Sequence, residues 1–156
     1  MLESSITKKG KEIKLMKLYL ASPFFNEEEL RLYRRAVEKL RLSGYDVFVP
    51  QEHSIEGAWE MSNEDWADAV YNMDVNAICD CDVVIVLNFG LYSDSGTAWE
   101  AGYAKALGKR VVQVLCGGDN AVYSLMMLSS ADKIVNFNQL QVWQRVEADL
   151  SKVIQK

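Results

Sequence analysis

The run Val83-Val-Ile-Val-Leu87 is apolar and mostly β-branched, which is typical of a central strand that is buried on both faces of a sheet. Residues 97–107 follow as a predicted helix that ends at Gly108, and residues 110–115 form another apolar run. This alternation of strand and helix predicts a parallel sheet that is covered by helices.

The same alternation continues on both sides of this unit. Helix caps are predicted at Asn26, three residues before Glu29, and at Ser62, three residues before Asp65. The first of these helices is expected to end at Gly44. The other predicted elements are strands at 18–21, 45–49 and 133–135 and a closing helix at 138–155. We therefore predict an α/β fold, with a doubly wound, five-stranded, mainly parallel sheet and helices on both faces.

Length and composition indicate a single folded domain. The chain has 156 residues, of which 49% are hydrophobic and 25% are charged, close to the average for a globular protein. Residues 1–17 contain five lysines and no apolar run of seven residues, a pattern that fits neither a signal peptide nor a membrane span. We expect residues 1–16 to be a disordered tail and residues 17–156 to form the domain.

The charge and the side-chain inventory exclude several classes of function. The formal net charge is −5, so the chain has no general attraction to nucleic acids or anionic membranes. The glycine-rich signatures of dinucleotide and triphosphate binding are absent, and a single histidine, His53, excludes multi-histidine metal sites. No cofactor and no metal are expected. Three cysteines, none spaced as paired zinc ligands, fit a reducing cytoplasm.

The segment Asp94-Ser-Gly-Thr-Ala-Trp-Glu100 is the leading candidate site, because such sheets bind ligands beyond the carboxyl ends of their strands. It places two carboxylates between a strand and a helix. A structural alternative is a capping box formed by Thr97 and Glu100. Asp74 adds a third carboxylate, either on the apolar face of its helix or at the exposed edge of that helix. Tyr19, in the first strand, is either part of the core or a hydroxyl presented to the crevice.

Further candidates lie in the loops at the same edge of the sheet. Phe24 and Phe25 follow the first strand and either stack on a planar ligand or pack on other side chains. Cys116 is interpreted as a core thiol, because no cationic neighbour in sequence activates it. His53 either touches a ligand or is a surface residue without a role.

Three segments together resemble the nucleoside 2-deoxyribosyltransferase family: Tyr19-Leu-Ala-Ser-Pro-Phe-Phe25, Tyr71-Asn-Met-Asp74 and Asp94-Ser-Gly-Thr-Ala-Trp-Glu100-Ala-Gly-Tyr. They occur in the order and with the separations of the family, over residues 17–135. The resemblance implies a flavodoxin-like fold. It also implies the exchange of a purine or pyrimidine base between 2-deoxynucleosides.

The resemblance implies a role for each polar candidate. Glu100 resembles the family's nucleophile, and Tyr19 resembles the hydroxyl that positions it. Asp74 resembles the acid that handles the proton of the base, and Asp94 resembles the acid that holds the 5-hydroxyl of the sugar. Water is expected to be kept out of the pocket by four apolar side chains: Phe24, Phe25, Trp66 and Met126.

These roles suit the cleavage of an N-glycosidic bond. Glu100, expected in the first helical turn and ionised by the helix dipole, would attack the anomeric carbon and form a covalent glycosyl-enzyme. Asp74, with a pKa raised by apolar surroundings, would protonate the leaving base. A second base would then attack the glycosyl-enzyme, and two inversions give net retention.

The family completes each site with a residue from a neighbouring subunit, commonly an asparagine in an Asn-Leu-Met segment. This chain has Ser124-Leu-Met126 at that place. The resemblance implies a homo-oligomer built of dimers, often a hexamer. Two alternatives stay open: an N-glycosidase that hydrolyses deoxynucleoside 5-monophosphates, and a non-catalytic nucleoside-binding module. Asp94 argues against the first alternative, because a carboxylate repels a phosphate dianion.

Overall fold

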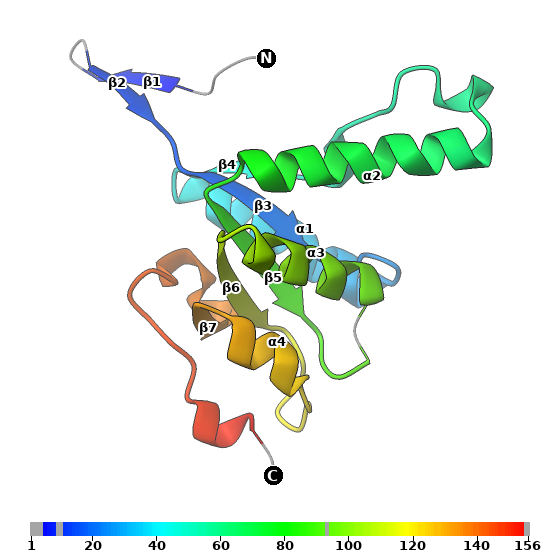
Figure 1. The fold of residues 1–156 in the computed structure, drawn as a ribbon. Coiled ribbons are helices and arrows are strands. Elements are labelled where there is room, and N and C mark those ends of the chain that lie inside the picture. The colour runs from blue at the N-terminus through cyan, green and yellow to red at the C-terminus, as the bar shows by residue number, and fades with distance from the viewer. Residues whose placement is uncertain (1–4, 9–10, 93, 155–156) are drawn as a thin grey trace.

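A five-stranded sheet, in which every strand runs parallel to its neighbours, forms the centre of the molecule (Figure 1). The structure is a computed structural model that describes residues 5–8, 11–92 and 94–154. The strands of this sheet are β3 (Lys17–Ala21), β4 (Asp46–Phe48), β5 (Val83–Asn88), β6 (Arg110–Leu115) and β7 (Lys133–Asn136). They lie in the order β4-β3-β5-β6-β7, which is the 2-1-3-4-5 order of flavodoxin-like sheets. The predicted α/β fold is confirmed.

Helices cover both faces of the sheet. They are α1 (Glu27–Leu42), α2 (Asn63–Asp80), α3 (Ser95–Ala106) and α4 (Leu125–Ser130). Tyr33 and Leu40 of α1 pack in the core of one face, whereas Ile78 of α2 and Ala104 of α3 pack in the core of the other. Because β3 lies between β4 and β5, the winding direction reverses between β3 and β5. Such a reversal opens a crevice at the carboxyl ends of the strands.

The two predicted helix caps are present. The Asn26 side chain accepts a hydrogen bond of 2.9 Å from the Glu29 backbone N–H at the start of α1. The Ser62 hydroxyl accepts one of 3.1 Å from the Asp65 N–H at the start of α2. Each cap satisfies a backbone donor that the first helical turn leaves unpaired. None of the helices within residues 5–8, 11–92 and 94–154 has the length and apolar character needed to cross a bilayer.

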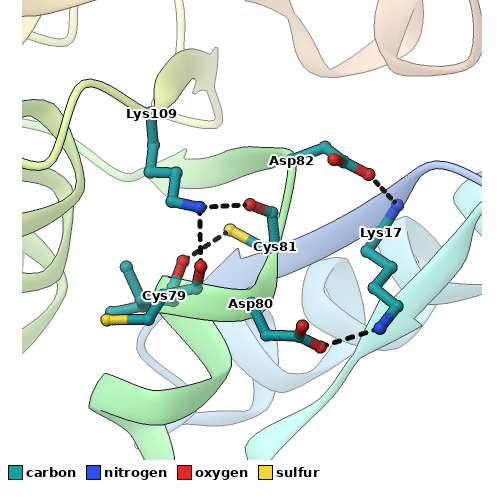
Figure 2. Close-up of polar contacts among 7 residues, drawn as sticks. Lys17, Cys79, Asp80, Cys81, Asp82 and Lys109 are labelled. Atoms are coloured by element: carbon teal, nitrogen blue, oxygen red, sulfur yellow. Dashed lines mark hydrogen bonds and ion pairs between the residues drawn. The ribbon is translucent and has the colours of Figure 1, made fainter.

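Two lysines hold the carboxyl end of α2 in place (Figure 2). Lys109 Nζ donates to the backbone oxygens of Cys79 and Cys81, at 2.6 and 2.8 Å. Lys17 Nζ contacts the Asp80 carboxylate at 2.8 Å, and the Lys17 backbone N–H donates to the carboxylate of Asp82. A cation on the last carbonyls of a helix opposes the negative end of its dipole. These contacts tie α2 to β3 and to the turn that precedes β6.

Residues 5–8 and 11–14 form a short antiparallel hairpin of β1 (Ser5–Lys8) and β2 (Lys11–Lys14), outside the main sheet. Figure 1 shows the hairpin extending away from the rest of the molecule. The segment that we expected to be a disordered tail therefore contains a pair of strands. The domain boundary at residue 17 stays a prediction.

The predicted closing helix at 138–155 is wrong. The chain forms two short 3-10 segments there, Phe137–Val142 and Leu150–Lys152. Leu140 and Trp143 are fully buried on the α1 face of the sheet, whereas Ala148 packs with Ile134 in a different core cluster. The Ala148 N–H donates to the Ile134 oxygen at 2.5 Å, so this part of the chain runs beside edge strand β7. A straight amphipathic helix has one apolar stripe and cannot fill both clusters.

Candidate active site

Tyr19 lies in the middle of β3, with no exposed surface, on the face that α2 and α3 cover. Its ring stacks on Phe48 of β4, with centroids 5.7 Å apart and planes at 12°. Its hydroxyl is buried and makes no hydrogen bond of ordinary length, yet it lies close enough to Glu100 and Asp74 to lower the pKa of both carboxyls. Burial, followed by the negative charges of Glu100 and Asp74, raises the pKa of the Tyr19 phenol. Tyr19 is thus both a core residue and a hydroxyl beside two carboxyls.

Asp94, and not Thr97, caps α3. One oxygen of the Asp94 carboxylate accepts from the Thr97 backbone N–H at 2.7 Å and from the Thr97 hydroxyl at 2.9 Å. The alternative of a capping box formed by Thr97 and Glu100 is therefore wrong. Because the cap is Asp94, the Glu100 carboxyl is not needed to satisfy the helix end.

Glu100 is the sixth residue of α3 and lies in its second turn. The expectation that it lies in the first turn and is kept ionised by the helix dipole is wrong, because α3 begins at Ser95. Burial instead raises the pKa of Glu100 to about 7, and the charges of Asp74 and Asp94 act in the same direction. The Tyr19 hydroxyl opposes this rise by interacting with the ionised form. A carboxyl with this pKa is ionised in about half of the molecules near neutral pH.

Asp74 lies on α2 and is partly buried, with its Oδ1 atom enclosed and without a hydrogen-bond partner. Burial raises its pKa, and both the His53 charge and the Tyr19 hydroxyl oppose that rise. The charge of Asp74 raises the pKa of both Tyr19 and Glu100, so the fold places these three predicted residues, from α2, β3 and α3, close to one another. Figure 1 shows α2 and α3 neighbouring each other on this face of the sheet. The arrangement places two carboxyls of raised pKa beside one phenol, which marks the cluster as a candidate functional site.

The aromatic candidates Phe24, Phe25 and Trp66 differ in how far they are buried. Phe24 packs against the core with its ring 5.5 Å from the ring of Tyr33, and Phe25, 77% exposed, lies 5.8 Å from Phe24. Trp66 is half exposed on the first turns of α2, eight residues before Asp74. Phe24 is therefore partly a packing residue, and the roles of Phe25 and Trp66 as pocket walls stay predictions.

Ser124 and Met126 lie at the start of α4. Ser124 is the residue before the helix, and its side chain makes no capping hydrogen bond. Met126 is 80% exposed, and Leu125 beside it is 56% exposed. The Met126 side chain therefore points away from the core of its own chain.

Some polar residues on the loop after β4 and at the end of α1 were missed from the sequence. Arg41, at the end of α1, forms an ion pair with Glu52, and the buried Tyr33 hydroxyl interacts with Gln51 and Glu52. Nothing in the hydrophobic pattern distinguishes Arg41 from any other basic residue in the last turn of a helix. Within the described parts of the chain, no three acidic, cysteine or histidine side chains cluster as metal ligands do.

The sequence of this chain matches a known protein family. Residues 18–137 match the family described as nucleoside 2-deoxyribosyltransferase. The chain belongs to this family. The matched region contains Tyr19, Asp74, Asp94 and Glu100, as well as Ser124 and Met126. The predicted resemblance is confirmed.

Individual relatives agree with this assignment. The chain is 25% identical over 135 residues to a nucleoside deoxyribosyltransferase from Lactobacillus leichmannii, covering 80% of this chain and 86% of that protein. It is 32% identical to the solved 2-deoxyribosyltransferase of Bacillus psychrosaccharolyticus, with a TM-score of 0.70 over 89% of this chain and 97% of the other. A CMP N-glycosidase from Clostridium botulinum, 23% identical, shares the fold with a TM-score of 0.56 over 83% and 95% of the two chains. The family match and the two deoxyribosyltransferase relatives support an enzyme of the nucleoside deoxyribosyltransferase type, whereas the N-glycosidase shows the shared fold alone.

Proposed function

We propose that the protein transfers a 2-deoxyribosyl group between nucleobases through a covalent glycosyl-enzyme on Glu100. The observation that carries this proposal is the meeting of Glu100, Asp74 and Tyr19 around one buried point, with Asp94 beside them. Family membership supports the same reaction class. Two buried carboxyls of raised pKa in one cluster are typical of functional sites and support the same proposal.

The proposed first step breaks the bond between the base and the anomeric carbon. The ionised Glu100 carboxylate attacks that carbon as the base leaves with the bonding electron pair, and the protonated Asp74 carboxyl gives its proton to the base. The Tyr19 hydroxyl holds the carboxylate of Glu100 toward the sugar. In the second step another base attacks the glycosyl-enzyme, returns a proton to Asp74 and releases Glu100 as a carboxylate.

Asp94 is proposed to select substrates at the sugar end. One of its oxygens caps α3 through Thr97, and we propose that the other accepts a hydrogen bond from a 5-hydroxyl. A 5-phosphate would face this carboxylate at close range, and two negative charges repel more strongly when water is excluded. We therefore propose 2-deoxynucleosides and free purine or pyrimidine bases, rather than nucleoside monophosphates, as substrates.

We further propose that the enzyme is a homo-oligomer of dimers, with Ser124 and Met126 reaching a neighbouring subunit's site. Two groups of apolar side chains at the surface support this: the exposed Met126 and Leu125 on α4, and a row of exposed or partly exposed rings on α2 and α3. In that row Tyr71 meets Trp99 at 5.7 Å, and Trp99 stacks on Tyr103 at 5.0 Å. Exposed aromatic clusters are typical of subunit interfaces. The free thiols of the three cysteines support a cytoplasmic location.

One incubation tests the reaction. The protein is given a purine deoxynucleoside and a different free base, and the products are separated by chromatography. A new deoxynucleoside confirms transfer, whereas free base without a new nucleoside indicates hydrolysis. A parallel incubation with the deoxynucleoside 5-monophosphate tests the N-glycosidase alternative. Thermal stabilisation by nucleoside with no turnover in either incubation would favour a binding module.

A further inference from the structure

An ion pair ties the turn after β4 to the end of α1. Arg41 Nη1 and Nη2 donate to the two carboxylate oxygens of Glu52, at 2.8 and 2.5 Å. Arg41 Nη2 also donates to the Val47 backbone oxygen at 3.2 Å. The planar guanidinium thus holds both a strand of the sheet and the 3-10 turn Pro50–Glu52 that follows it.

The residue next to the pair begins a row of stacked rings. His53, whose N–H donates to the Pro50 oxygen at 3.1 Å, places its imidazole on the Phe48 ring at 4.3 Å and 11°. Phe48 in turn stacks on Tyr19. The row leads from an exposed loop to the Tyr19 phenol beside Glu100. A displacement of the loop would therefore shift the rings that pack against Tyr19.

His53 also acts on the cluster through its charge. The charge of His53 acts to lower the pKa of Asp74 on α2 and that of Glu52 in its own loop. His53, Phe48 and Met73, the neighbour of Asp74, line one cavity of about 720 Å³ between β4 and α2. Asp46, Asp80 and Lys17 line the same cavity and are the other charged groups there. The position of the loop therefore sets how strongly His53 acts on the carboxyl that handles the proton of the base.

The ion pair has little value as a simple stabiliser. Both side chains are nearly half exposed, at 42% and 49%, and exposed pairs add little to stability because water screens them. The two parallel hydrogen bonds from the Arg41 guanidinium nevertheless fix both the distance and the orientation of the Glu52 carboxylate. The buried Tyr33 hydroxyl, which interacts with the Gln51 backbone, lies under the same turn.

We propose that the Arg41–Glu52 ion pair is a positioning device for the nucleobase side of the active site, which holds His53 on Phe48 and beside Asp74. The proposal rests on the proposed function, since it assigns Asp74 to the leaving base. Arg41 and Glu52 act here through His53 and do not touch the substrate. His53 is then a positioning residue for Asp74.

The first test needs no activity. His53 is the single histidine of the chain, so its imidazole proton signals identify themselves in a nuclear magnetic resonance spectrum. Stacking on Phe48 shifts these signals through the ring current of the phenyl ring. Arg41→Met is expected to reduce this shift. The matched control is Lys105→Met, which removes a similarly exposed ion pair with Asp132 and is expected to leave the signals unchanged.

The second test is kinetic. Arg41→Met and His53→Ala are each expected to lower kcat/KM for base exchange by about tenfold, as small displacements in an active site do, and to alter its pH profile. The double variant should lose no more than the larger single loss, because one residue acts through the other. Lys105→Met is expected to keep the wild-type kinetics, and the melting temperatures of Arg41→Met and Lys105→Met should be similar.

The outcomes separate this proposal from the proposed function. A wild-type protein that exchanges no base refutes the function, and the ring-current shift then decides alone whether the ion pair fixes His53. If the wild type exchanges bases, unchanged kinetics in Arg41→Met overturn the positioning role. Losses that multiply in the double variant also overturn it, because Arg41 would then act independently of His53.

Discussion

At the scale of single residues, the proposed chemistry depends on the Glu100 carboxyl being free of structural duties. Asp94 caps α3, so replacing Glu100 removes no helix cap. Glu100→Gln keeps the shape of the side chain and removes the nucleophile. We expect base exchange to fall on the order of 10³-fold or more, measured by chromatography of the products. The exposed Glu147→Gln is the control and should exchange bases like the wild type. Exchange by Glu100→Gln near the wild-type rate would refute the glycosyl-enzyme.

The raised pKa of Glu100 also predicts how stability changes with pH. The folded value is about 7, above the ordinary value of 4.5, so the folded state holds a proton that the unfolded state releases between these pH values. Stability is therefore lost as pH rises from about 4.5 to about 7, by about 3 kcal/mol at most. Glu100→Gln is not expected to lose stability in this way, because the glutamine side chain does not ionise. Urea unfolding should find the variant more stable than the wild type at pH 8, with a much smaller difference at pH 4.5. An equal difference at both pH values would contradict a buried Glu100 with a raised pKa.

At the scale of elements, α2 positions Asp74, and its carboxyl end is held by Lys109 (Figure 2). Lys109→Met should cost about 1 to 2 kcal/mol in the free energy of unfolding, because two charged hydrogen bonds to the helix end are lost. It should also slow base exchange by loosening α2. Lys152→Met, which removes an exposed pair with Asp149, should cost less than about 0.5 kcal/mol. Equal costs for the two variants, measured by urea unfolding, would show that Lys109 does not stabilise α2.

The carboxyl-terminal segment stabilises the fold through buried side chains and not through helix formation. Trp143 is fully buried on the α1 face, whereas Val142 beside it is 41% exposed. Trp143→Ala should lower the free energy of unfolding by about 3 to 5 kcal/mol. Val142→Ala should change it by less than about 1 kcal/mol. Comparable losses for both substitutions would contradict the different burial of the two side chains.

At the scale of the whole molecule, the proposed shared sites predict complementation between two inactive variants. Met126→Glu alters an exposed side chain, so each chain should fold, but its charge would disturb a neighbour's site. Co-expression with Glu100→Gln produces mixed dimers in which one site has both native residues. Random pairing should restore about a quarter of the wild-type exchange activity. A fully active Met126→Glu variant, or mixed dimers with no activity above their parents, would show that each chain completes its own site.

Much of the architecture is predictable from the sequence, because strands buried on both faces and capped amphipathic helices leave strong local patterns. Val83-Val-Ile-Val-Leu87 is a central strand, and Asn26 and Ser62 cap helices as expected. Local patterns fail where one segment serves two faces of the sheet. Residues 138–155 have the composition of a helix, yet Trp143 and Ala148 belong to different core clusters. The course of residues 138–154 is decided by the apolar surface beside edge strand β7, which these side chains cover.

By itself, the sequence determined the order of the elements, the parallel sheet, the carboxylates that follow its strands and the family to which these motifs belong. Only the tertiary structure decided that Asp94 and not Thr97 caps α3, and that burial rather than the helix dipole governs Glu100. It alone joined Arg41 to Glu52 and stacked His53 on Phe48. The physical reason is that hydrophobic periodicity depends on neighbours a few residues apart. The protonation of a carboxyl depends instead on every charge and every dry surface that folding brings around it.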